Sequence, residues 1–419
     1  MGQMPAGNGI LQISTGEPSK RSTNSTPDSY FLQSHRNSIW GSKTKRIVSN
    51  MAQEVLQAGL ASGLSATSGF HEQKPPQVPQ SFDQSSELMP SDYVPSKDTL
   101  VTYRGKKGNV KTAPISIGAW PWGDTATWHW SPEELPAVKA GWKSLHANGI
   151  NHIDTAQVYG TGESERICGE LVKGMKRDDF VMQTKMWTLA TNPQNLINWN
   201  TAPYVKLKES LERFGLDYVD VYMVHGHNHM QSIATIAKSL AQCVDEGLTK
   251  TVAVGNYSKD DMLKMQAELA KYDVPLACNQ CEYNILRREP EVSGLLRACK
   301  ENNIVFQAYS SLAQGRLTGK YHKDNQPPSS YRFSNYPMEM IDPTLDVLKK
   351  IASARGKPVA AVSLNYALVH GIVPVVGTRS EAQAESNAQA LGWRLSDEEI
   401  KQIDAVSFQG KTTVLWQQG

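Results

Sequence analysis

Four polar residues stand where apolar, strand-like runs of this sequence end. Asp154 and Tyr159 lie in a turn between the run 149–153 and a helix start at 162–165. Lys185 closes the run 180–184, and His225 closes the run 219–224. Tyrosine, with an ordinary pKa of about 10, donates protons poorly at neutral pH unless a cation stabilises its phenolate. Lys185 can be that cation, and Asp154 can keep it charged.

Together these residues suit the protonation of a carbonyl oxygen. His225 can hydrogen-bond that oxygen and orient it toward Tyr159, the proton donor, while a cofactor delivers hydride to the carbon. The sequence therefore predicts Asp154, Tyr159, Lys185 and His225 as the catalytic residues.

The sequence lacks the glycine-rich fingerprint that many dinucleotide-binding proteins share. Gly160-Thr-Gly162-Glu-Ser-Glu165 has glutamate where the third glycine belongs. A second cradle runs from Val375 to Gln383, where a strand-like run passes into a helix N-terminus beside Arg379. Helix N-termini favour phosphate, and arginine favours a phosphomonoester. The same residues also form an ordinary capping box, so both interpretations remain open.

Two further motifs raise the alternative of a metal site. His225-Gly-His227-Asn-His229 resembles the start of some metal-dependent hydrolase sites, but no later histidine stands at a strand end. Cys278 and Cys281 have C-x-x-C spacing, but residues three apart in a strand face opposite ways. The sequence predicts no metal. The five cysteines are odd in number and irregularly spaced, which favours a reducing compartment.

The elements that must position these residues alternate between strand and helix from about residue 100. A hairpin is expected around 105–109, and a capped helix begins at Ser131. The long segment between Leu312 and Asp342 suggests a loop over the mouth of the site. Strands are expected at 115–119, 150–154, 180–185, 219–225, 251–254, 276–280, 304–308 and 373–376. Eight strands separated by helices predict an α/β chain folded as a (β/α)8, or TIM, barrel.

Residues 1–95 differ from the barrel domain, 96–419, in being rich in serine and proline. They predict a mostly disordered extension with one short amphipathic helix at Met51–Leu60. The first 45 residues are poor in acids, so a transit peptide to an organelle is the alternative to an unstructured extension of a cytoplasmic protein. The net charge of +2 favours no nucleic-acid partner, and no apolar run is long enough for a membrane span. The oligomeric state stays open.

The sequence resembles the aldo-keto reductase family over roughly residues 100–405. The motifs that carry the resemblance are the four catalytic candidates, Val254–Ser258, Asn279–Asn284, Ala308–Gly315 and Gly377 through Asn387. Leu-Thr-Gly-Lys-Tyr at 317–321 is similar to the branch with plastid-type and pyridoxal reductases. Gly255 stands in place of a frequent serine, and Ser386 in place of a frequent glutamate. The resemblance implies NADPH as cofactor, bound by Asn256, Gln280, Tyr309, Ser310, Leu312, Gly377, Arg379, Gln383 and Asn387.

Tryptophans gather where a substrate would enter. Trp120 and Trp122 follow the first expected barrel strand, and Trp187 follows Lys185 by two residues. Their flat apolar faces predict a small-molecule substrate with an aromatic or apolar carbonyl group. No arginine or lysine beyond Lys185 is clearly assigned to this face. The alternative is an NADPH-binding regulatory or sensor subunit with little turnover.

Overall fold

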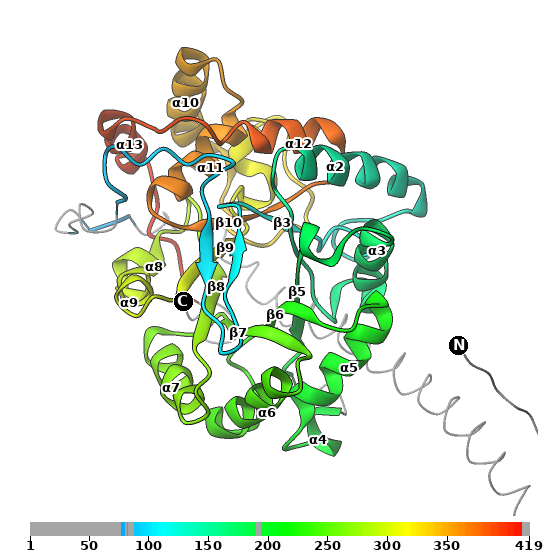
Figure 1. Cartoon of the computed structure of the whole chain (residues 1–419). Helices are drawn as coiled ribbons and strands as arrows, with labels where there is room; N and C mark the ends of the chain where they lie inside the picture. Colours follow the sequence, from blue (N-terminus) through cyan, green and yellow to red (C-terminus); the bar gives the residue numbers. More distant parts are fainter. Residues whose placement is uncertain (1–76, 80–81, 83–87, 190–193, 413–419) are drawn as a thin grey trace, which may run out of the picture. The chain divides into compact units, whose positions relative to one another are not determined.

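The predicted (β/α)8 barrel is present in the computed structural model, which describes residues 77–79, 82, 88–189 and 194–412. The proposed helix at Met51–Leu60 lies outside these residues. Eight parallel strands close on one another in the order β10, β3, β4, β5, β6, β7, β8 and β9 (Figure 1). They are β3 (Ser116–Gly118), β4 (His152–Asp154), β5 (Val181–Met186), β6 (Val219–Val224), β7 (Thr249–Gly255), β8 (Leu276–Glu282), β9 (Val305–Tyr309) and β10 (Val373–Gly377).

Each expected strand overlaps one of these eight. β5, β6 and β8 are buried along their whole length, which explains why they read as runs rather than as alternating patterns. Closure places Val375 of β10 opposite Ser116 of β3. Because all eight strands are parallel, their carboxyl ends share one face of the barrel, and the predicted catalytic residues stand on that face.

Helices surround the strands (Figure 1). The expected capped helix begins with a capping box between Ser131 and Glu134 and continues as α2. The helical elements are η2 (Pro132–Glu134), α2 (Leu135–Ala147), η3 (Tyr159–Gly162), α3 (Glu163–Val172), η4 (Arg177–Asp179), α4 (Gln194–Ile197), α5 (Ala202–Phe214), α6 (Ile233–Asp245), α7 (Lys259–Ala270), α8 (Glu289–Val292), α9 (Leu295–Glu301), η5 (Ala313–Thr318), α10 (Met338–Arg355), α11 (Val359–Val369), α12 (Glu381–Ala388) and α13 (Asp397–Asp404). Within the described part of the chain, none of these helices has the length and apolar character that a membrane crossing requires.

The expected hairpin covers the amino-terminal end of the barrel. β1 (Val101–Tyr103) pairs with β2 (Val110–Thr112), and Tyr103 and Val110 pack into a cluster with apolar residues from inside the barrel. Tyr103 also accepts a hydrogen bond from Gln307 of β9 at 2.8 Å. The hairpin thus closes the end opposite the predicted catalytic residues.

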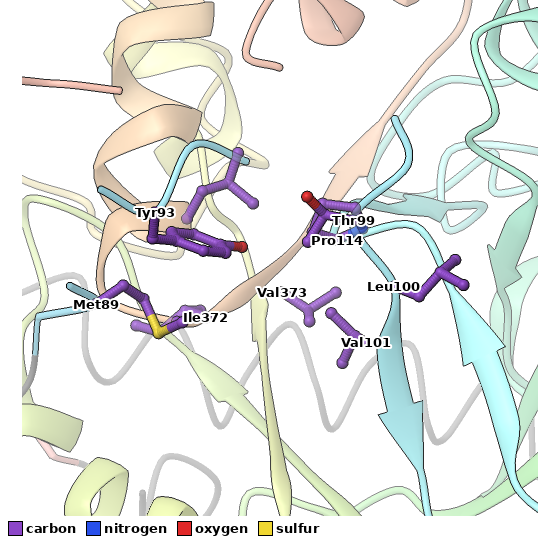
Figure 2. A pocket seen from close by; sticks show the side chains of 10 residues that line it. Met89, Tyr93, Thr99, Leu100, Val101, Pro114, Ile372 and Val373 are labelled. Atoms are coloured by element: carbon purple, nitrogen blue, oxygen red, sulfur yellow. The ribbon is translucent and has the colours of Figure 1, made fainter. Parts of the chain in front are cut away.

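Contacts with the barrel begin before the boundary expected at residue 96. The Met89 amide donates to the Val369 carbonyl at 2.8 Å, and the Gly392 amide donates to the Pro95 carbonyl at 2.7 Å. Met89 and Tyr93 also line an apolar cavity of about 160 Å³ beside the start of β10 (Figure 2). The segment from residue 88 to 95 is therefore packed on the barrel domain.

Candidate active site

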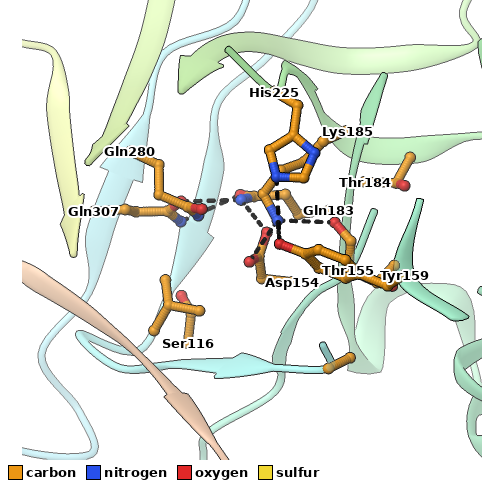
Figure 3. Close-up of polar contacts among 12 residues, drawn as sticks. Ser116, Asp154, Thr155, Tyr159, Gln183, Thr184, Lys185, His225, Gln280 and Gln307 are labelled. Atoms are coloured by element: carbon orange, nitrogen blue, oxygen red, sulfur yellow. Dashed lines mark hydrogen bonds and ion pairs between the residues drawn. The ribbon is translucent and has the colours of Figure 1, made fainter. Parts of the chain in front are cut away.

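The four predicted catalytic residues come together at the carboxyl ends of three neighbouring strands (Figure 3). Asp154 ends β4, Lys185 lies near the end of β5, His225 follows β6, and Tyr159 begins η3. The Lys185 ammonium lies 2.7 Å from the Asp154 carboxylate and 3.4 Å from the Tyr159 hydroxyl. The same hydroxyl lies 3.4 Å from His225 Nε2. A lysine and a histidine therefore flank one phenol oxygen.

Burial governs the protonation of this group. It raises the pKa of Tyr159 well above its usual value, with Asp154 and Asp124 adding to the shift. Burial lowers the pKa of Lys185, and Asp154 opposes that change. The pKa of His225 is also lowered well below its usual value, first by burial and then by Lys185. At neutral pH the site therefore holds a phenol and a neutral imidazole. Lys185, which the sequence predicts to stabilise the Tyr159 phenolate, lies 3.4 Å from the hydroxyl, but burial has the larger effect on the Tyr159 pKa.

Three buried glutamines form a network that holds Asp154, and sequence reasoning missed two of them, Gln183 and Gln307 (Figure 3). Gln183 Nε2 donates to Asp154 Oδ1 at 2.5 Å and to Gln307 Oε1 at 3.0 Å. Gln280 donates to the same Gln307 oxygen at 2.8 Å. Polar residues inside apolar strand-like runs were the available signal, because buried amides need partners. The network holds the Asp154 carboxylate in one orientation.

Three predicted cofactor residues lie at the carboxyl ends of β7, β8 and β9. Gln280 belongs to β8 and Tyr309 ends β9, while Asn256 follows β7 in a left-handed conformation with φ 59°. The Tyr309 hydroxyl donates to Asn256 Oδ1 at 2.9 Å, and Asn256 Nδ2 donates to the His225 carbonyl at 3.1 Å. Gly255 has no side chain to clash, since an added Cβ would lie 3.0 Å from the His225 carbonyl oxygen.

The turn after β9 is strained. Ser310, Ala313 and Gln314 all have positive φ, at 53°, 49° and 51°. Such strain concentrates at functional sites. The buried Gln314 Nε2 has no hydrogen-bond partner within the described ranges, although Gln314 Oε1 accepts the Arg332 and Phe333 amides. The turn that holds Ser310 and Leu312 therefore contains a buried donor that an acceptor on a ligand would satisfy.

The predicted phosphate cradle lies where β10 passes into α12. Ser380 caps α12, and the Arg379 amide donates to Gln383 Oε1 at 2.7 Å. Asn387 is buried and bonds to Thr378 at 3.2 Å. Gly377 is exposed at the mouth of the cradle. The Arg379 guanidinium, however, is engaged by Glu134 of η2, a contact across 245 residues that the sequence did not reveal.

The tryptophans occupy different places. Trp120 stacks on Tyr159 with ring centroids 5.8 Å apart, and Trp187 meets His225 edge-on at 5.5 Å. Trp122 is only 1% exposed, and its indole nitrogen donates to the Thr378 carbonyl at 2.7 Å. Trp120 and Trp187 therefore flank the predicted catalytic residues, whereas Trp122 ties its loop to the cradle.

The segment between η5 and α10 lies against the aromatic wall formed by Trp120 and Trp187, through contacts with Trp120. The sequence predicted a loop over the mouth of the site in this segment. Phe333 packs between Trp120 and Tyr309, with centroids 5.9 and 5.2 Å away. The Arg332 guanidinium stands over the Trp120 ring at 5.7 Å. Burial lowers the pKa of Arg332, but the group stays charged. The sequence did not assign this cation to the substrate face.

The motifs considered for metals have other surroundings. His229 bonds through one ring nitrogen to Tyr257 and through the other to the Gln231 carbonyl, both at 2.6 Å. Cys278 packs in the barrel interior, and Cys281 packs in the core outside it. Across the described part of the chain, no three His, Cys, Asp or Glu residues are grouped to hold a metal ion. All five cysteines are buried free thiols.

The fold and this site define a known class of enzyme. The family model for the Aldo/keto reductase family matches residues 114–407. The chain belongs to this family and is an oxidoreductase.

Most of the length of each relative named below aligns with this chain. A chloroplastic pyridoxal reductase of Arabidopsis thaliana is 30% identical over 71% of this chain and 84% of its own. An L-glyceraldehyde 3-phosphate reductase of Escherichia coli O157:H7 is 30% identical over 75% of this chain and 94% of its own. Among solved structures, an aldo-keto reductase from Klebsiella pneumoniae in complex with NADPH matches with a TM-score of 0.59 and 23% identity, covering 75% of this chain and 97% of that one.

Proposed function

We propose that the protein reduces an aldehyde or ketone to the alcohol with NADPH, using Tyr159 as the proton donor. The observation that carries the proposal is the Tyr159 hydroxyl within 3.4 Å of both Lys185 Nζ and His225 Nε2. NADPH, when bound, supplies the hydride to the carbonyl carbon. Tyr159 gives its proton to the carbonyl oxygen, and the bond order between carbon and oxygen falls from two to one.

The neighbours of Tyr159 have separate roles in this step. Neutral His225 donates a hydrogen bond that orients the carbonyl oxygen, as its lowered pKa permits. The Lys185 ammonium stabilises the phenolate left when the proton departs. Asp154 keeps that ammonium in place and charged, at 2.7 Å. Solvent then returns a proton to Tyr159, which restores the site.

Each part of NADPH is assigned to residues at the barrel mouth or in the cradle at α12. Asn256 and Gln280 hold the nicotinamide carboxamide, and Tyr309 stacks on the ring. Ser310 and Leu312 line the diphosphate. The adenosine end lies in the α12 cradle, with the 2′-phosphate beside Arg379. The residues proposed for the adenosine end are Gly377, Arg379, Gln383 and Asn387.

The proposed substrate is an aromatic or extended apolar carbonyl compound. Trp120 stacked on Tyr159, and Trp187 against His225, place flat apolar surfaces next to the proton donor. An acidic substituent on such a substrate would meet Arg332 above Trp120. Trp122 is left out of this wall because its indole bonds to the Thr378 carbonyl of the cradle.

Steady-state reduction of benzaldehyde-type compounds, followed by loss of NADPH absorbance, tests the proposal. We expect turnover by the full chain and its loss in Tyr159→Phe, whose side chain keeps the ring and lacks the proton. A chain that binds NADPH without turning over any carbonyl compound would instead be the regulatory or sensor subunit. For the compartment, we propose the cytoplasm or another reducing compartment, because all five thiols are free.

A further inference from the structure

Arg379 is the charged residue that we propose for the 2′-phosphate. Its guanidinium is already paired with the carboxylate of Glu134. Its Nε lies 2.8 Å from Glu134 Oε2, and its Nη2 lies 2.6 Å from Glu134 Oε1. Nη1 donates to the Trp128 carbonyl at 3.2 Å. The two ionic side chains are 28% and 26% exposed. The carboxylate thus occupies the fork of the guanidinium in the bidentate manner that suits a planar anion.

This pair is held by the fold rather than by chance rotamers. Glu134 lies at the start of the helical segment that continues as α2, and its Oε1 also accepts the Ser131 amide at 3.3 Å. Close packing brings α2 and the start of α12 together at Gly141, where an added Cβ would lie 3.0 Å from the Ser380 carbonyl oxygen. Glu134 and Arg379 are therefore presented to each other by two packed helical elements.

A phosphomonoester binds arginine through the same fork that Glu134 occupies. A 2′-phosphate reaching Arg379 must displace the carboxylate or share the guanidinium with it, and either arrangement sets two anionic groups beside one cation. A cofactor whose ribose carries a 2′-hydroxyl in place of the phosphate does not meet this conflict.

We propose that Glu134 is a specificity-determining residue that competes with the 2′-phosphate of NADPH for Arg379. Glu134 weakens the binding of NADPH but not that of NADH. It therefore reduces the ratio by which the protein prefers NADPH to NADH. The inference rests on the proposed function, in which Arg379 holds the 2′-phosphate.

The test is cofactor binding to the full chain without substrate, measured by quenching of tryptophan fluorescence. Glu134→Gln removes the charge and keeps an oxygen for the Ser131 amide. We expect the Kd for NADPH to fall about 3- to 10-fold, in line with partly exposed ion pairs. The Kd for NADH should stay within about 2-fold. An increase in the NADPH Kd would mean that Glu134 positions Arg379 for the phosphate, and this result or no change would overturn the proposal.

Two further variants separate the possible failures. Glu133→Gln removes the same charge from the neighbouring exposed residue, and it should leave both Kd values unchanged. An equal gain in both glutamine variants would show a general charge effect and overturn the role of Glu134. Arg379→Met should lower the preference for NADPH. If it does not, the placement of the phosphate fails. If it does, while Glu134→Gln has no effect, only the competition fails.

Discussion

Lys185 and Asp154 form an ion pair in which both side chains are almost completely buried. The Lys185 side chain is 0% exposed and the Asp154 side chain 4%. Removal of one partner from such a pair leaves a buried charge without compensation, which typically costs about 3–5 kcal/mol. The pair persists at the barrel mouth because Thr155 and Gln183 supply further hydrogen bonds to its two members. It therefore keeps a cation beside Tyr159 in an environment that opposes charge.

Asp154→Asn should move the alkaline limb of the pH profile to lower pH. Burial lowers the pKa of Lys185 and Asp154 raises it, so loss of the carboxylate lets the pKa fall further. Asp154 also raises the pKa of Tyr159, so its loss lowers that pKa too. Lys185 then loses its proton, and Tyr159 its donor form, at lower pH than in the wild type. The measurement is kcat/KM for one aldehyde from about pH 6 to 10.

The acid side of the same profile supplies the control. The pKa of His225 lies well below its usual value of about 6.5, so the imidazole gains a proton only under strongly acidic conditions. We expect the wild-type kcat/KM to change little from about pH 8 down to 6. An alkaline limb that stayed in place in Asp154→Asn would contradict the proposed support of Lys185 by Asp154.

Tyr159→Phe should reduce kcat by about 10²- to 10⁴-fold, the range that general acids contribute. The Phe ring keeps the stacking on Trp120, whose centroid lies 5.8 Å away. Cofactor affinity should therefore stay close to that of the wild type, as measured by fluorescence quenching. Wild-type rates in this variant would remove Tyr159 from the mechanism.

The grouping of the proposed catalytic residues could be predicted from the sequence because its members stand at the ends of recognisable strands. Parallel strands that close into a barrel bring such ends to one face, so the order of Asp154, Lys185 and His225 along the chain was sufficient to predict their proximity. The hairpin and the helix start at Ser131 followed from local turn and capping patterns of similar clarity.

The contacts that escaped prediction join residues far apart in the chain. Glu134 looked like a capping residue, and its sequence context contains nothing of Arg379, 245 residues away. Gln183 and Gln307 are partners from β5 and β9, which are not adjacent in the barrel. Trp122 resembled its neighbour Trp120 in sequence, but the two differ in burial, which depends on how the loop folds back.

The segment before residue 96 should contribute to stability but not to chemistry. A chain that starts at Ser96 lacks the hydrogen bond from Met89 to Val369 and the one from Gly392 to Pro95. It also lacks Met89 and Tyr93, two of the side chains that line the cavity beside β10. We expect it to lose about 2–4 kcal/mol in the free energy of unfolding relative to a chain that starts at Gln77. Urea denaturation of both truncations measures the difference.

The control for that comparison is catalysis. None of the proposed catalytic or cofactor residues precedes residue 96, so both truncated chains should match the full chain in kcat at a temperature where they stay folded. Equal unfolding free energies for the two truncations would show that the segment from 77 to 95 does not brace the barrel.

NADPH should bind more tightly than NADH, with the difference near the lower end of what a charged contact provides. Charge-assisted hydrogen bonds are worth about 1.5–3 kcal/mol, or roughly 10- to 150-fold in affinity. Because Glu134 already occupies the Arg379 fork, we expect a ratio of Kd values near about 10. Titration of the wild type with each cofactor checks this, and equal affinities would contradict a 2′-phosphate contact.

The aromatic wall should favour aromatic carbonyl compounds over small polar ones. Trp120 covers Tyr159, and Phe333 packs against Trp120 and Tyr309, so a flat substrate can bury its ring beside the proton donor. A substrate panel should therefore include benzaldehyde, pyridoxal, methylglyoxal, glyceraldehyde and L-glyceraldehyde 3-phosphate. We expect the highest kcat/KM for the ring-containing compounds. Higher values for glyceraldehyde, its 3-phosphate or methylglyoxal would refute the aromatic preference.

Trp120→Ala identifies the wall as the cause of that preference. The variant removes the surface stacked on Tyr159, so the kcat/KM for benzaldehyde should fall roughly 5- to 150-fold. This corresponds to a loss of about 1–3 kcal/mol in transition-state stabilisation. Methylglyoxal, which has no ring to bury, should lose much less. Trp122→Phe is the matched control, because Trp122 is buried away from the substrate and bonds to Thr378. The Trp122→Phe variant should be less stable, but its ratio of benzaldehyde to methylglyoxal activity should not change. If Trp120→Ala instead lost activity equally with both substrates, Trp120 would support Tyr159 rather than the substrate ring.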